Sequence, residues 1–205
     1  MHGSFRAALA LAMFVFAVRA LAAGGPLGID HRLNRDERGI WSRSNQLGLE
    51  KALIAGEFAL ALWEGGETRL GRTAWQSIDS SLLAAVATEA GKRTFGRERP
   101  YQSDDPNRFF HGGQSFPSGE VALASSVVTP FVLEYGGDAP AAYLLELLPA
   151  YDAVARMKSQ AHWQTDVLAA FALGTATGWY AHSRGQPLTL TLLPHGFMVG
   201  IRRQF

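Results

Sequence analysis

One stretch of the sequence places a guanidinium, an imidazole and a carboxylate at spacings suited to chemistry: Arg156, His162 and Asp166. Residues i and i+4 share one face of a helix, so Asp166 can accept the proton on one nitrogen of His162 and leave the other nitrogen nucleophilic. The planar fork of Arg156 suits bidentate binding of a phosphate oxyanion. Taken alone, these residues fit a solvated His–Asp pair more simply, and a metal site lacks an evident third and fourth ligand.

A second group of chemically capable residues is a basic cluster made of Lys92, Arg93, Arg97 and Arg99. A solvated basic helix end is the simpler interpretation, because cations are favourable near a helix C-terminus. The alternative is an anion clamp in which Lys92 and Arg99 reach one phosphate from two sides.

The third group is Pro117-Ser118-Gly119-Glu120, which has the composition of a helix start. Free backbone N–H groups and the positive end of the helix dipole favour an anion there, and a glycine lets a ligand approach the backbone. Ser118 is equally well explained as an ordinary N-cap.

Together the three clusters resemble the type 2 phosphatidic acid phosphatase superfamily, which includes bacterial class A acid phosphatases and vanadium haloperoxidases. The family pattern is Lys-x6-Arg-Pro, then Pro-Ser-Gly-His, then Ser-Arg-x5-His-x3-Asp. The matching positions are Lys92, Arg99, Pro100, Pro117, Ser118, Gly119, Arg156, His162 and Asp166. The resemblance implies that His162 is a nucleophile forming a phosphohistidine and that Asp166 orients it. It also implies a phosphate held by Lys92, Arg99, Arg156 and the Ser118–Gly119 backbone, with no metal or other cofactor.

Two family positions differ in this sequence. Ala155 stands where the family has serine, and Glu120 stands where it has the histidine that protonates the leaving group. Glu120 can take over that proton transfer, since a bound phosphate disfavours its ionised form. Alternatively, His111 in the preceding loop is the acid, or the domain binds phosphate without turnover. Weak acid assistance predicts a preference for good leaving groups, as in pyrophosphate linkages and aryl phosphates.

The elements that must position these residues are predicted to be helices. We expect a mainly α fold, a helical bundle of the phosphatidic acid phosphatase/haloperoxidase type, with a short C-terminal β-hairpin at residues 188–201. The helices are expected at residues 47–63, 73–94, 117–135, 140–155 and 161–182. The chain of 205 residues is long enough for one domain with a sizeable core.

The N-terminal segment indicates export. Residues 1–22 have the basic start, the apolar run and the Ala20-Leu21-Ala22 cleavage site of a signal peptide, with an uncleaved anchor as the alternative. Residues 23–205 then form the phosphatase domain, located in the periplasm or at the periplasmic face of a membrane. An integral membrane protein is the less favoured interpretation.

Composition excludes several other classes. A net charge of +1 gives no case for a nucleic-acid partner, and the absence of cysteine excludes disulfides and thiolate metal sites. We therefore predict an exported, metal-independent phosphatase acting on phosphate mono- or pyrophosphate esters of a small molecule or a lipid. Apolar helices and the aromatic residues Phe109, Phe110, Phe116 and Trp163 suggest association with a membrane surface, although these rings also suit a core. The alternatives are a phosphate- or phospholipid-binding module and a vanadium-dependent haloperoxidase.

Overall fold

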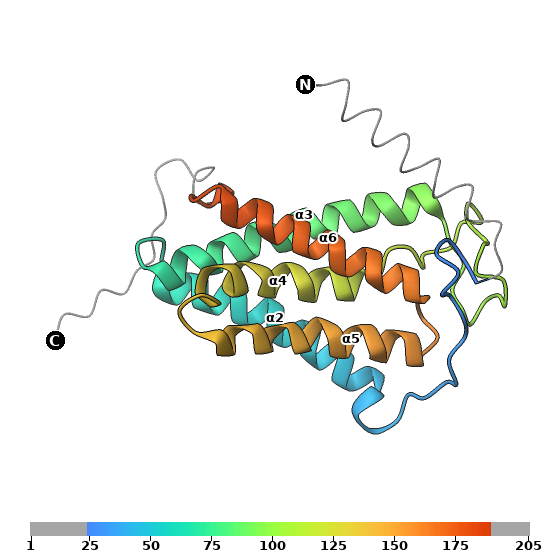
Figure 1. The fold of residues 1–205 in the computed structure, drawn as a ribbon. Coiled ribbons are helices and arrows are strands. Elements are labelled where there is room, and N and C mark those ends of the chain that lie inside the picture. Colours follow the sequence, from blue (N-terminus) through green and yellow to red (C-terminus); the bar gives the residue numbers. More distant parts are fainter. Residues whose placement is uncertain (1–23, 190–205) are drawn as a thin grey trace, which may run out of the picture.

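The computed structural model describes residues 24–189, which form a bundle of five α-helices with two short 3-10 helices (Figure 1). The α-helices are α2 (Arg43–Glu64), α3 (Arg69–Phe95), α4 (Gly119–Tyr135), α5 (Leu147–Lys158) and α6 (Gln164–Ser183). The 3-10 helices are η1 (Gly39–Trp41) and η2 (Pro140–Glu146). The predicted mainly α fold is confirmed.

Helix α4 is the central element, because it packs against α3, α5 and α6. Its residues Val121 and Ala122 form a buried apolar cluster with Val167 and Ala170 of α6. The two helices approach closely at Gly174, where an added Cβ would lie 2.4 Å from the backbone oxygen of Ala122. The absence of a side chain at Gly174 therefore sets the distance between α4 and α6.

All three sequence clusters lie at one end of the bundle. Figure 1 shows that α3 and α5 end there and that α2, α4 and α6 begin there. Gly96 ends α3 in the left-handed conformation at φ 45°, and its N–H bonds to the oxygen of Lys92. The chain then runs through an irregular loop until α4 begins at Gly119. A basic helix end and a helix start are thereby brought to the same place.

An irregular N-terminal segment, residues 24–38, closes this end of the bundle. The backbone N–H of Asp36 bonds to the oxygen of Lys158 at 3.0 Å, and the N–H of His31 bonds to the side chain of Gln164 at 3.0 Å. These bonds tie the segment to the connection between α5 and α6.

The observed elements differ from the predicted ones at several boundaries, and α2 and α3 each begin four residues earlier than predicted. The predicted helix at 140–155 is divided into η2 and α5, and the predicted helix from residue 161 begins only at Gln164. The predicted signal peptide and nearly all of the C-terminal hairpin lie outside the described residues. None of the helices within residues 24–189 is both long and apolar enough to cross a membrane.

Candidate active site

A cavity of about 390 Å³ opens at the end of the bundle where the clusters meet. Its wall includes six of the residues that the sequence singled out: Lys92, Arg99, Gly119, Glu120, Arg156 and His162. Apolar side chains of α2, α3 and α4 complete the wall, among them Ile54, Ala85 and Leu123. Side chains distant in the sequence thus share one hollow.

His162 lies in the connection between α5 and α6 and is 3% exposed. Its Nδ1 is 2.6 Å from the backbone oxygen of Ser115. A carbonyl oxygen can only accept, so this contact places the imidazole proton on Nδ1. The other nitrogen, Nε2, is then left without a proton and has a lone pair available for attack.

The structure differs from the predicted pairing of His162 and Asp166 in two respects. His162 precedes α6 instead of sharing a helical face with Asp166. Asp166 Oδ2 is 3.9 Å from His162 Nδ1, and the hydrogen bond of that nitrogen goes to Ser115. The Ser115 carbonyl therefore fixes the tautomer that the sequence had led us to attribute to the carboxylate.

Asp166 instead anchors the structure around the imidazole. Its carboxylate accepts from Ser115 Oγ at 2.5 Å, from the N–H of Trp163 at 2.8 Å and from Arg97 Nη1 at 2.6 Å. Ser115 contacts His162 and Trp163 follows it in the chain. Asp166 therefore orients the imidazole indirectly, through these two residues.

Arg97 is the buried cation that balances Asp166. Its guanidinium is fully buried and also donates from Nη2 to Asp30 Oδ2 at 2.6 Å. Nη1 donates to Thr165 Oγ1 at 2.8 Å, and Nε donates to the oxygen of Pro106 at 3.0 Å. One side chain therefore joins the N-terminal segment, the loop before α4 and the first turn of α6.

Burial and charge keep the imidazole neutral. Burial, with the nearby charges of Arg156 and Arg99, lowers the pKa of His162 well below its usual value. Burial raises the pKa of Asp166 to about 6, although Arg97 and Ser115 act in the opposite direction. At neutral pH the site therefore holds a neutral imidazole beside a carboxylate that is mostly ionised.

Three cations face the cavity from separate elements. Lys92 comes from the last turn of α3, Arg99 from the loop and Arg156 from α5. Burial, followed by the charge of Arg99, lowers the pKa of Lys92, and burial lowers that of Arg156. Burial and mutual repulsion destabilise these charged groups, and an anion that binds between them would stabilise them.

Two predicted members of the basic cluster do not face the cavity. Arg97 is buried among carboxylates, and Arg93 is exposed and pairs with Glu89 at 2.7 Å. The clamp of Lys92 and Arg99 is the part of that cluster that the structure brings together.

The start of α4 presents unsatisfied polar groups to the site. Ser118 is the N-cap residue, but its side chain makes no cap hydrogen bond. Ser118 Oγ, Thr88 Oγ1 and Arg156 Nε are buried, and none has a hydrogen-bond partner within residues 24–189. Gly119 adjoins them, and an added Cβ there would lie 3.3 Å from Lys92 Nζ. Buried donors without partners beside three cations are what an oxyanion ligand would satisfy.

Glu120 lines the cavity and is engaged by two guanidinium groups. Its Oε2 accepts from Arg43 Nη1 at 2.6 Å and lies 3.5 Å from Arg156 Nη1. Arg156 also donates to the side chain of Gln46 at 2.9 Å. His111, the alternative acid, is exposed in the loop and does not line the cavity. The geometry favours Glu120 over His111 for a role at the bound ligand.

Sequence reasoning missed four residues around the site: Arg43, Gln46, Arg97 as a structural cation, and Ser115. Arg43 and Gln46 come from α2, where no motif marks them. Ser115 acts through its backbone oxygen, which has no sequence signature. Trp163, by contrast, is 1% exposed and donates Nε1 to the oxygen of Glu98, as the core interpretation of this ring expects.

Within the part of the chain that the structure describes, no group of three or more His, Cys, Asp or Glu side chains is placed to hold a metal ion.

Comparisons with known proteins identify a family, a related sequence and a related fold. The family model of the PAP2 superfamily matches residues 74–189. Over 106 residues the chain is 34% identical to the lipid A 1-phosphatase of Porphyromonas gingivalis, a match that covers 50% of this chain and 21% of that protein. The fold is similar to the crystal structure of Aquifex aeolicus LpxE, with a TM-score of 0.54, 17% identity, and coverage of 71% of this chain and 88% of the other.

Replacing Arg97 by Met tests its structural role. We expect the free energy of unfolding to fall by about 3–5 kcal/mol, because two buried carboxylates lose their cation. Arg93→Met removes an equally charged side chain that is 80% exposed and should cost less than about 0.5 kcal/mol. Urea denaturation followed by circular dichroism measures both. Equal stability of the two variants would show that Arg97 does not hold the site together.

Proposed function

Because the chain belongs to the PAP2 superfamily, we propose that it is a phosphatase that hydrolyses phosphate mono- or pyrophosphate esters through a phosphohistidine at His162. One observation carries the proposal. The buried neutral imidazole, with no proton on Nε2, lines the same cavity as Lys92, Arg99 and Arg156. A nucleophile that carries no proton needs no separate base, and the cations stabilise the charge that develops on phosphorus oxygens.

The first step is attack of His162 Nε2 on phosphorus. The N–P bond forms while the bond from phosphorus to the leaving oxygen breaks. The proton on Nδ1 remains hydrogen-bonded to the Ser115 oxygen, so the positive charge that the ring acquires is shared with a carbonyl dipole and the nearby Asp166 carboxylate. Lys92, Arg99 and Arg156, with the N–H groups that begin α4, bind the three remaining oxygens.

Glu120 supplies the proton that the leaving oxygen requires. A phosphate dianion competes with Glu120 for Arg156 and adds negative charge beside it, and both effects favour the protonated carboxyl. In the second step a water attacks the phosphohistidine, Glu120 receives its proton, and His162 is released. Over the cycle the ester and one water become an alcohol and phosphate.

The substrate class is proposed to be lipid-linked. Exposed apolar side chains continue from the cavity along α2 and α3: Ile54, Phe58, Leu62, Leu82 and Val86. On α2 they recur every four residues from the cavity residue Ile54, so they share its face. Both rows run toward the turn that joins α2 to α3, which gives an acyl or prenyl chain an apolar path away from the cations.

A lipid-linked substrate also indicates where the protein acts. We propose that the protein is exported and acts at the periplasmic face of a membrane, where a lipid phosphate presents its headgroup. The signal-like N-terminal sequence and the name of the Porphyromonas gingivalis relative, a lipid A 1-phosphatase, support this assignment.

One observation favours a second candidate, a phosphate- or phospholipid-binding module without turnover. Glu120 replaces the acid histidine of the family pattern and is paired with Arg43. If this pair persists when phosphate is bound, the leaving oxygen receives no proton.

Trapping the intermediate separates the two candidates. Incubation with a labelled aryl phosphate followed by a base quench should leave label on the protein, because a phosphohistidine is stable to base and labile to acid. His162→Ala should lose both the label and phosphate release, whereas His182→Ala, at the far end of α6, should retain both. Binding of phosphate without label or release would instead support the binding module.

Glu120→Gln tests the proton donor. Release from an alkyl phosphate should fall by about 10²-fold or more, because an alkoxide leaves slowly without a proton. Release from an aryl phosphate should change little, since a phenoxide leaves without help. Glu89→Gln alters another carboxylate at the cavity wall and should leave both rates near those of the unaltered protein. Equal losses on the two substrates after Glu120→Gln would show that Glu120 is not the acid.

A further inference from the structure

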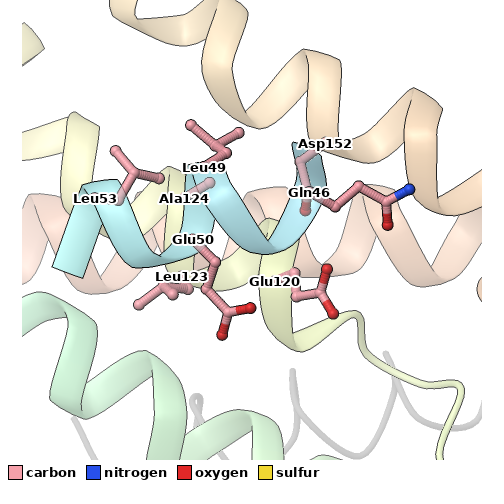
Figure 2. A pocket seen from close by; sticks show the side chains of 8 residues that line it. All are labelled: Gln46, Leu49, Glu50, Leu53, Glu120, Leu123, Ala124 and Asp152. Atoms are coloured by element: carbon pink, nitrogen blue, oxygen red, sulfur yellow. The ribbon is translucent and has the colours of Figure 1, made fainter. Parts of the chain in front are cut away.

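A second, much smaller cavity adjoins the first, and Glu50, Glu120 and Leu123 line both. Figure 2 shows its lining side chains, which come from α2, α4 and α5: Gln46, Leu49, Glu50, Leu53, Glu120, Leu123, Ala124 and Asp152. Its volume is about 10 Å³. That is about the space one water occupies, and the side chains of Gln46, Glu50, Glu120 and Asp152 provide the polar partners that a buried water needs.

Asp152 is the unusual member of this wall. It is 2% exposed, and neither carboxylate oxygen has a hydrogen-bond partner in the described part of the chain. A buried ionised carboxylate without partners is strongly disfavoured, whereas a protonated one can donate to a water. Arg156 lies one turn further along α5, but its Nη1 is directed to Gln46 and Glu120.

Asp152 and the carboxyl groups around it outnumber the nearby guanidinium groups by one, which favours one protonated carboxyl. The facing groups are Arg43 and Glu50 on α2, Glu120 on α4 and Arg156 on α5. Three carboxyl groups therefore meet two guanidinium groups. Burial, followed by the charge of Glu120, raises the pKa of Asp152 to about 7, and burial also raises that of Glu50. Asp152 is the deepest of the three and the one best suited to keep the proton near neutral pH.

We propose that Asp152 is the proton store for Glu120, connected to it through a single water in the cavity that the two side chains share. The inference rests on the proposed phosphatase activity and extends it to a residue that does not touch the substrate. Its role is to position and supply a proton.

The proton transfers balance over one turnover. When phosphate binds, Asp152 gives its proton to the water, which passes one on to Glu120. Glu120 gives that proton to the leaving oxygen as the bond from phosphorus to this oxygen breaks, and is left ionised. When water attacks the phosphohistidine, its proton goes to Glu120 and returns to Asp152 by the same path.

Asp152→Asn keeps the shape of the side chain but removes the titrating group. The rate on an alkyl phosphate should fall on the order of tenfold, and the rate on an aryl phosphate should not change. The decline of the alkyl rate above about pH 7 should disappear in the variant, because the group that loses its proton there is absent. Asp152→Glu should restore both the rate and the decline.

The matched control is Glu146→Gln. Glu146 is also a carboxyl whose pKa is raised by burial, and its Oε2 has no hydrogen-bond partner among the described residues. It lines neither cavity, so its loss should leave the ratio of alkyl to aryl rates unchanged. Equal losses on both substrates after Asp152→Asn would overturn the proposal.

Infrared spectroscopy gives a readout that does not require turnover. At pH 6 the difference between the spectra of the unaltered protein and Asp152→Asn should contain a protonated-carboxyl band that fades as the pH rises through about 7. Absence of that band would overturn the proton store even if phosphate is released. If the band is present but no phosphate ester is hydrolysed, the proposed function fails, and with it the role of Asp152 in catalysis.

Discussion

The buried guanidinium of Arg97 between Asp30 and Asp166 is the interaction on which the rest of the site depends. Asp166 can remain ionised in the interior because Arg97 lies 2.6 Å away, and in turn it fixes Ser115 and the first turn of α6. Ser115 then fixes the tautomer of His162. The orientation of one imidazole is therefore determined by a chain of buried polar contacts, each satisfied by the next.

The same arrangement explains how an imidazole stays neutral and reactive. Burial and the charges of Arg156 and Arg99 lower the pKa of His162, so it carries no proton on Nε2 at neutral pH. The cations that suppress its protonation are also those suited to hold the phosphate. In the proposed mechanism, binding of a phosphate dianion neutralises them, which stabilises the positive charge that the ring would acquire once the N–P bond forms.

The sequence predicted the helical bundle and the cavity residues because their types and spacing have direct physical meaning. Apolar periodicity marks helices, and a basic helix end, a helix start and a nucleophile suit one anion. It could not predict the role of Ser115, since a backbone oxygen leaves no trace in residue type. The sequence also predicted a direct hydrogen bond from His162 to Asp166. That prediction assumed that both residues are helical, as i and i+4 must be to share a face, whereas His162 precedes α6. Gln46 and Asp152 became recognisable only when α2 and α5 were packed against α4.

The central claim is that His162 Nε2 and the three cations define one site for a phosphoryl group. A crystal structure with orthovanadate, which adopts the five-coordinate geometry of a phosphoryl group under attack, tests it most directly. The account predicts vanadium bonded to His162 Nε2, with its oxygens contacting Lys92, Arg99, Arg156 and the start of α4. Vanadate bound elsewhere, or an unoccupied cavity at saturating vanadate, would contradict it.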